Sequence, residues 1–173
     1  LDIAASNFYT SGQYVIKDRA QAFSSKELIA FYEELDKNYH LFSLEDPLQE
    51  DDWAGWQELT SVLGPTTLIV GDDLLATNKD RLRKAIASKA CTAILVKPNQ
   101  IGTISETIEV INISKTAGFK IIVSHRSGET NDDFIADFAA GLGADYTKFG
   151  APVRGERIAK YNRLLAIEED LSS

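Results

Sequence analysis

Short apolar runs alternate with longer stretches of helical periodicity along the chain, and this alternation restricts the fold more than any other feature. Parallel strands cannot be joined by tight turns and need a crossover connection, which is usually a helix. Apolar runs separated by helices of this length therefore predict a parallel sheet covered by helices. Strands are expected at residues 40–43, 67–70, 93–96, 120–123 and 145–147.

Helix start signals fall between these strands. Three pairs have the spacing in which a side chain caps a helix N-terminus, namely Ser24 with Glu27, Thr103 with Glu106, and Thr130 with Asp133. Glycines or a Gly-Pro pair follow several of the helical stretches, as is typical of helix ends. The expected helices are 24–38, 50–64, 78–89, 103–118, 130–141 and 153–171, and residues 8–22 are expected to be irregular.

The number of strand-helix units points to an incomplete barrel. A full eight-unit β/α barrel needs roughly 250 residues, or about 30 for each unit. A chain of 173 residues supplies between five and six such units. We therefore predict an α/β fold, a partial TIM-type β/α barrel with about six of its eight strands, as a single incomplete domain over residues 1–173. Leu1 already lies in a predicted strand, so we expect a fragment of a longer protein.

Composition excludes several classes of partner. The formal net charge of -8 argues against nucleic acid and anionic membrane, because an acidic surface repels both. The sequence has no apolar run of transmembrane length and no leader pattern. Its one cysteine, Cys91, allows no internal disulfide and is expected to be a buried, inert thiol. These features favour a cytoplasmic location.

Acidic residues follow or begin three successive predicted strands. Asp2, Glu45 and Asp72 occupy these positions, and the loops after the strands of a parallel barrel form its active-site face. Hard cations such as Mg²⁺ prefer carboxylate oxygens, and without a cation three close carboxylates would repel one another. The alternative is that each residue only caps the helix that follows. The shared position of all three favours a Mg²⁺ site.

Basic residues occupy the same position after the later strands. Lys97 and Lys148 each follow a strand, where a lysine can act as a general base or simply pair with a neighbouring carboxylate. The segment 124–130 (Ser-His-Arg-Ser-Gly-Glu-Thr) is the densest polar cluster in the chain. Arg126 offers a bidentate fork and Ser127 a hydroxyl just before a helix, which together make a plausible cradle for phosphate.

Several of these segments closely resemble enolase, the glycolytic phosphopyruvate hydratase, and the resemblance runs from Leu1 to about Leu171. The Asn-Gln-Ile-Gly and Ser-His-Arg-Ser-Gly-Glu-Thr blocks are specific to that family, whereas an isolated Glu-Asp-Pro would be weak. The matching segments are 43–47 (Ser-Leu-Glu-Asp-Pro), 71–74 (Gly-Asp-Asp-Leu), 97–103 (Lys-Pro-Asn-Gln-Ile-Gly-Thr), 124–130, and 157–162 (Arg-Ile-Ala-Lys-Tyr-Asn).

The resemblance implies a lyase that reversibly dehydrates 2-phosphoglycerate to phosphoenolpyruvate with Mg²⁺, and a homodimer in the full-length protein. It also implies a role for each candidate residue. Asp2, Glu45 and Asp72 match the metal ligands, Lys97 the base that removes the C2 proton, Lys148 the lysine on the substrate carboxylate, Arg126 and Ser127 the phosphate-binding pair, and His125 a neighbour in the substrate pocket.

The sequence departs from the common enolase pattern in two ways. Phe149 replaces a small hydroxyl residue, Gly155 a serine, and Gly71 an alanine or threonine. The resemblance also implies an N-terminal domain and two first barrel strands, absent here, which supply a mobile loop, a histidine and glutamates. We therefore expect the chain alone to be inactive. Two alternatives are an acid-sugar dehydratase of the same superfamily and a non-catalytic protein of the cell surface.

Overall fold

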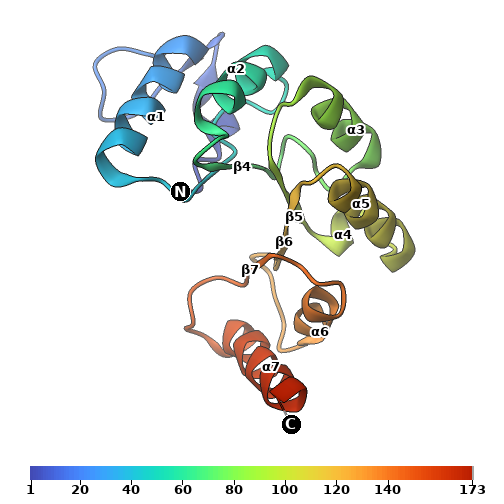
Figure 1. The fold of residues 1–173 in the computed structure, drawn as a ribbon. Helices are drawn as coiled ribbons and strands as arrows, with labels where there is room; N and C mark the ends of the chain where they lie inside the picture. Colours follow the sequence, from blue (N-terminus) through green and yellow to red (C-terminus); the bar gives the residue numbers. More distant parts are fainter. Residues whose placement is uncertain (173) are drawn as a thin grey trace.

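The computed structural model describes residues 1–172 and contains a five-stranded, wholly parallel sheet in the order β3-β4-β5-β6-β7. Each strand pairs with its neighbour in sequence, and helices fill the crossovers, as predicted. Figure 1 shows the strands running in sequence from the α1–α2 end of the molecule to the α6–α7 end. The strands are β3 (Ser43–Glu45), β4 (Leu68–Gly71), β5 (Ala93–Val96), β6 (Lys120–Ser124) and β7 (Tyr146–Lys148).

Six longer helices cover the sheet, and one short helix follows β5. Neighbouring helices pack in pairs, α1 against α2, α3 against α5, and α6 against α7. Among residues 1–172, no helix combines the length and apolar character that crossing a bilayer requires. The helices are α1 (Ser25–Tyr39), α2 (Trp53–Leu63), α3 (Lys79–Ser88), α4 (Pro98–Ile101), α5 (Ile104–Thr116), α6 (Phe134–Gly141) and α7 (Gly155–Ser172).

The sheet curls so strongly that side chains from its two outer edges meet. Phe42, just before β3, packs edge-to-face on Tyr146 of β7, with ring centroids 5.4 Å apart. In a flat sheet, strands four places apart would lie roughly 19 Å from each other, because neighbours are about 4.8 Å apart. The partial barrel is therefore confirmed. The Asp2–Glu45 bridge adds a sixth strand position beside β3.

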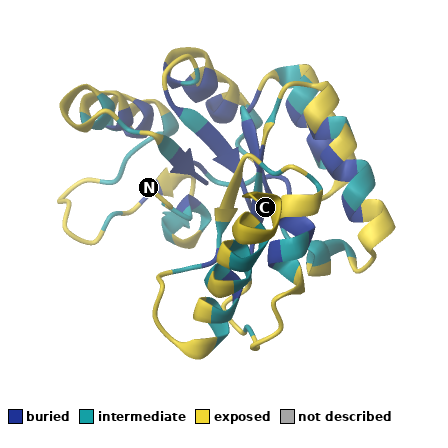
Figure 2. Ribbon diagram, turned by 60° about the horizontal axis from the view of Figure 1, so that its bottom comes forward, coloured by how far each residue is buried: buried dark blue, intermediate teal, exposed yellow. Residues whose placement is uncertain are grey.

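Both faces of the central strands are buried. On β5, Ile94 and Val96 belong to the large core beneath the helices, whereas Ala93 and Leu95 join Val70 in a smaller core on the inner face. Figure 2 shows these strands in dark blue, with exposed residues concentrated on the outer sides of the helices. Burial on both sides explains why the strands were visible in the sequence as uninterrupted apolar runs.

One strand prediction was displaced. Residues 40–43 were expected to be extended, but β3 begins at Ser43. His40 ends α1 in the left-handed conformation with φ of 52°, and its N–H donates to the carbonyl of Asp36. The Leu41 N–H then donates to the Asp36 carboxylate at 2.8 Å, so the chain is still turning there. The strand can begin only after this turn is complete.

The segment 8–22, expected to be irregular, contains a small antiparallel hairpin. Strands β1 (Tyr9–Thr10) and β2 (Gln13–Tyr14) follow a short 3-10 helix, η1 (Ala5–Phe8). The turn residues Ser11 and Gly12 both have positive φ, which suits a two-residue hairpin. Tyr14 is fully buried and carries the hairpin into the core.

The predicted caps differ in outcome. Ser24 and Glu27 form the expected reciprocal capping box at α1. Thr103 accepts the Glu106 N–H as predicted at α5. The pairing of Thr130 with Asp133 was wrong: Asp133 precedes α6 without a side-chain cap. The Thr130 hydroxyl instead accepts the Asp132 N–H within the preceding loop, at 3.3 Å.

Candidate functional site

The alternation of side chains along each strand brings several candidate residues to one face of the sheet. Residues in register on parallel neighbours share a face, and Ser124 of β6 is in register with Lys148 of β7. Glu45 is in register with Val70, which belongs to the inner core. Two residues after Val70, Asp72 returns to the same side. Carboxylates and lysines therefore gather on the inner face, where the strands end.

Lys148 joins Asp2 and Glu45. Its Nζ lies 2.9 Å from Asp2 Oδ2 and 2.6 Å from Glu45 Oε1, so β7 is tied to the start of the chain and to β3. Backbone bonds hold the first residues beside β3: the Ile3 N–H donates to the Glu45 carbonyl at 2.9 Å, and the Glu45 N–H to the Leu1 carbonyl at 2.8 Å. Two predicted metal ligands thus share one lysine.

Lys97 pairs with the third predicted ligand, Asp72. Its Nζ lies 2.7 and 2.5 Å from the two carboxylate oxygens, and both side chains are largely buried. The Lys97 N–H donates to the hydroxyl of the fully buried Thr77 at 3.0 Å, which fixes the backbone where β5 ends. The predicted base is therefore rigidly placed against a carboxylate.

Burial and ion pairing act against each other in this cluster, and burial prevails at Glu45 but not at Lys148. Burial raises the pKa of Glu45, and although the bond from Lys148 opposes the rise, the charges of Asp2 and Asp72 add to it. Burial alone would lower the pKa of Lys148, but its bonds to Glu45 and Asp2 outweigh burial and raise that pKa. Lys148 thus remains a cation beside two carboxylates.

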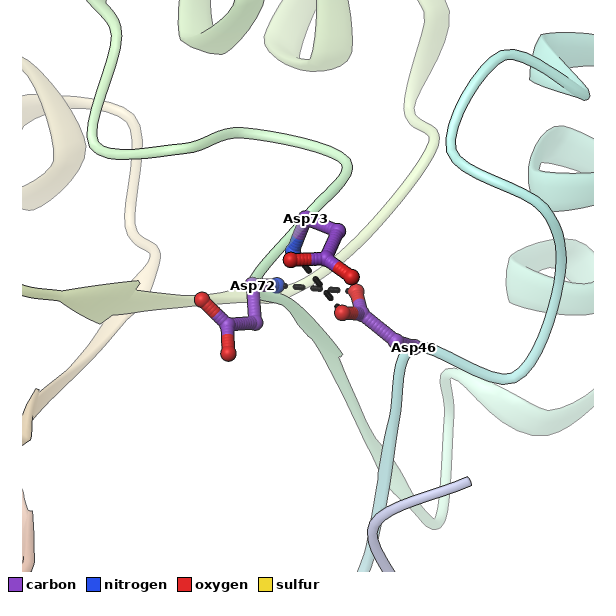
Figure 3. A group of neighbouring side chains, drawn as sticks. All are labelled: Asp46, Asp72 and Asp73. Carbon is purple, nitrogen blue, oxygen red and sulfur yellow. Dashed lines mark hydrogen bonds between the residues drawn. The ribbon is translucent and has the colours of Figure 1, made fainter. Parts of the chain in front are cut away.

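A second carboxylate cluster joins Asp46, Asp72 and Asp73 (Figure 3). Within residues 1–172, these three form the acidic group in which one oxygen from each carboxylate lies within 4.8 Å of the other two. Asp46 is nearly buried, and its two oxygens accept the N–H groups of Asp72 at 2.9 Å and Asp73 at 2.8 Å. In Figure 3 the Asp72 side chain points away from Asp46.

Asp46 therefore holds the backbone at the end of β4 and is also a potential metal ligand. Burial raises its pKa to about 7, against the two backbone N–H bonds, which favour the ionised form. Its backbone has φ of 44°, so the chain bends sharply to aim this carboxylate at the neighbouring strand. The sequence placed Asp46 beside Glu45, but nothing in the sequence indicated this contact.

The polar loop after β6 lies beside the end of β7. The His125 N–H donates to the carbonyl of Lys148 at 3.0 Å. The Arg126 guanidinium donates to Asn99 Oδ1 at 3.0 Å, which joins α4 to the loop after β6 beside a cavity of about 180 Å³. Arg126 and Ser127 are both exposed.

His125 is held tightly on one side. Its Nδ1 is buried and is the one such side-chain atom without a hydrogen-bond partner among residues 1–172. Burial lowers the pKa of His125, and the charges of Arg157 and Lys148 lower it further. Gly150 has φ of 79°, and a Cβ there would lie 2.9 Å from both His125 Cε1 and Arg157 Cδ. The close approach therefore needs glycine.

Carboxylate oxygens at the ends of parallel strands are the donor set that a hard divalent cation prefers. The two lysine ammonium groups already place positive charge against Asp2, Glu45 and Asp72. Among residues 1–172, the acidic group whose carboxylates lie close enough together to hold one such ion is Asp46, Asp72 and Asp73.

Comparison with known proteins identifies the family. Residues 1–173 match the family described as "Enolase, C-terminal TIM barrel domain". The chain belongs to the enolase family.

Curated enolases from distant organisms align with nearly the whole chain. Enolase of Elusimicrobium minutum is 52% identical over 171 residues, covering 99% of this chain and 40% of the relative. Enolase of Acidothermus cellulolyticus is 49% identical over 171 residues, covering 99% and 39%. Enolase 1 of Methanospirillum hungatei is 46% identical over 173 residues, covering 100% and 41%. The chain thus spans about two-fifths of the length of these relatives.

Two of the three departures from the common enolase pattern have local explanations. A Cβ at Gly71 would lie 2.8 Å from Leu75 Cγ, so Leu75 fills the space that a larger residue would need. Phe149 is fully buried and packs edge-to-face on Tyr161, with centroids 6.1 Å apart. A Cβ at Gly155 would meet only Asn131, at 3.5 Å, so a serine would fit there.

Proposed function

We propose that this chain is the metal-binding and base-bearing part of a glycolytic enolase, which dehydrates 2-phosphoglycerate reversibly to phosphoenolpyruvate with Mg²⁺. The observation that carries the proposal is the double ion pairing on the inner face. Lys148 joins Asp2 and Glu45, and Lys97 joins Asp72, where the strands end. This combination of carboxylates and amines matches a reaction that removes a proton beside a carboxylate.

Asp2, Glu45 and Asp72 would hold the Mg²⁺. When bound, Mg²⁺ would neutralise the substrate carboxylate, whose negative charge grows as the neighbouring C–H is deprotonated. The Asp46 carboxylate helps to fix the position of Asp72, because its Oδ1 accepts the Asp72 N–H at 2.9 Å. Its own two oxygens are occupied by backbone N–H groups.

Lys97 is proposed as the base that takes the C2 proton. An amine accepts a proton only through a free lone pair, so Lys97 must lose both its proton and its contact with Asp72 before the step. The bond from its backbone to Thr77 keeps the strand end fixed while the side chain moves. The C2–H bond then breaks, its electron pair moves toward the substrate carboxylate, and Nζ carries the proton.

Lys148 is proposed to stabilise the charge that this step creates. Its ammonium stays protonated because its bonds to Glu45 and Asp2 raise its pKa. A fixed cation facing the substrate carboxylate favours the doubly charged intermediate over the ground state. Lys97 and Lys148 therefore have opposite requirements: one must be neutral and the other charged.

Arg126 and Ser127 are proposed to bind the phosphate, with His125 beside them. A guanidinium offers two parallel donors to phosphate oxygens, and a serine adds a hydroxyl. Both residues are exposed in a loop that lies next to Lys148, because the His125 N–H bonds to the Lys148 carbonyl. The phosphate and the carboxylate of one small substrate would thus meet neighbouring parts of the chain.

Residues 1–173 are proposed as a single incomplete barrel domain, and the whole protein as a cytoplasmic homodimer. Hydroxide departure from C3 needs a proton donor, which the resemblance assigns to residues outside this chain. The chain alone is therefore expected to lack efficient turnover.

Turnover of 2-phosphoglycerate by the protein that carries this chain tests the proposal. We expect Mg²⁺-dependent turnover, and a loss of about 100-fold or more in kcat for Lys97→Ala, the size expected for removing a general base. Lys37→Ala is the matched control, since Lys37 is an exposed lysine of α1. Full activity in Lys97→Ala would refute the assignment of the base.

A further inference from the structure

Lys160 of α7 is a buried cation that the proposed reaction does not use. It is fully buried, and it is the one buried residue of α7. Removing an ammonium from water is costly unless oxygen atoms replace the lost hydration. Four oxygens do so: Glu129 Oε2 at 2.9 Å and the carbonyls of Thr130 at 3.0 Å, Asp132 at 2.8 Å and Glu156 at 2.8 Å.

Three of these four oxygens belong to the loop 129–132, which follows the proposed phosphate-binding residues. The loop has no strand or helix of its own. Its backbone carbonyls therefore depend on an outside donor, and Lys160 supplies it from a rigid helix. An exposed lysine would stabilise α7 equally well. The burial of Lys160 is therefore explained by its bonds to the loop 129–132 rather than by the needs of the helix.

Glu129 passes this restraint on to Arg126. While one carboxylate oxygen accepts from Lys160, the other accepts the Arg126 N–H at 2.7 Å. These bonds outweigh burial and lower the pKa of Glu129, so it remains an ionised acceptor. Lys160, Glu129 and the Arg126 backbone thus form a continuous connection from α7 to the phosphate-binding turn.

We propose that Lys160 is a positioning residue that fixes the anion-binding turn 125–127 through Glu129. The phosphate part of this inference rests on the proposed function, because it takes Arg126 and Ser127 as the anion ligands. The positioning part rests on the contacts of Lys160 alone. A fixed turn presents its donors without an ordering cost when the anion arrives.

Arg163, almost one turn further along α7, provides a matched control. Its guanidinium forms two bonds with Asp137 of α6, at 2.8 and 2.6 Å, and so also ties α7 to the rest of the molecule. Both of these bonds run to α6 rather than to the loop 129–132. Arg163→Met should therefore weaken the docking of α7 without releasing Arg126.

The experiment compares the full chain with Lys160→Met, Glu129→Gln and Arg163→Met. Amide hydrogen exchange at Arg126 reports the order of the turn, and titrations with inorganic phosphate and with Mg²⁺ report the two binding functions separately. We expect Lys160→Met to speed exchange at Arg126 and weaken phosphate binding, each about tenfold, the size of one lost charge-assisted hydrogen bond. Lys160→Met should leave the Mg²⁺ affinity unchanged. Arg163→Met should change neither the exchange at Arg126 nor the affinity for phosphate.

Glu129→Gln tests the connection even if Lys160→Met fails to fold. A glutamine has one acceptor oxygen, and the structure requires two, one for Lys160 and one for Arg126. Exchange at Arg126 should rise in this variant too. Unchanged exchange in either folded variant overturns the inference. If the wild type binds no phosphate while exchange rises as expected, the positioning role stands and the phosphate assignment of the proposed function fails.

Discussion

Replacing Lys148 with methionine should strengthen Mg²⁺ binding. In this structure the Lys148 ammonium occupies the oxygens that Mg²⁺ would need, at 2.9 Å from Asp2 and 2.6 Å from Glu45. A cation that binds there must displace the Lys148 ammonium from these oxygens, and it is then repelled by the positive charge that remains nearby. Methionine keeps most of the side-chain volume but removes the competing charge. Because Lys148 stays protonated, the competition persists at neutral pH.

The size of the expected change in Mg²⁺ affinity follows from how exposed the two ion pairs of Lys148 are. Asp2 is half exposed, so its pair with Lys148 is worth little, whereas the Glu45 side chain is only 10% exposed and its pair is worth more. Partly exposed ion pairs contribute about 0.2–1 kcal/mol each. Together they give about 1 kcal/mol, which corresponds to roughly fivefold tighter Mg²⁺ binding.

Titration calorimetry with Mg²⁺ at fixed pH and ionic strength measures this change. Lys120→Met is the control, because Lys120 pairs with Asp145 at 2.7 Å at the opposite end of β6. It should leave Mg²⁺ affinity unchanged. Equal or weaker binding in Lys148→Met would show that the lysine does not compete for these carboxylates, and would refute this view of the site.

Two further predictions concern stability. Phe149→Ser should lower the free energy of unfolding by about 4 kcal/mol, because it removes a fully buried ring and leaves a cavity. Urea denaturation measures the loss, and Phe134→Ser on the exposed part of α6 is the control. A loss below about 1 kcal/mol for Phe149→Ser would contradict the packing. Burial raises the pKa of Tyr14 to about 12, above the value of about 10 in an unfolded chain, so its stabilising contribution is complete below about pH 10 and is lost as the pH rises through about 12. Urea midpoints between pH 9 and 12 should fall less steeply for Tyr14→Phe than for the wild type, and identical slopes would exclude Tyr14 as a source of the loss.

The parallel sheet was predictable because burial on both faces makes the strands into continuous apolar runs, as in β5. The N-terminal part of the fold was harder to predict from the sequence. The start of β3 depends on the left-handed residue His40, a conformation that the sequence does not mark with glycine. The β1–β2 hairpin did leave a signal, the Ser-Gly pair at its turn, which the expectation of an irregular segment overlooked.

The places of the candidate residues at strand ends were predictable, but their partners were not. Strand ends identified Asp2 and Lys148 separately, whereas their contact joins residues 146 positions apart and depends on how far the sheet curls. Lys160 lies on an ordinary-looking helix, and only the packing of α7 against the loop after β6 makes it a buried cation. Long-range contacts of this kind carry no local sequence pattern.

Exchange of the C2 proton of 2-phosphoglycerate with deuterated solvent tests the central claim most directly. It separates the proposed proton removal by Lys97 from the later departure of hydroxide. We predict Mg²⁺-dependent exchange, followed by NMR, in the protein that carries this chain, and its loss in Lys97→Ala. No exchange in the unaltered protein, or exchange that survives Lys97→Ala, would contradict the assignment of this face as the metal and base site of an enolase.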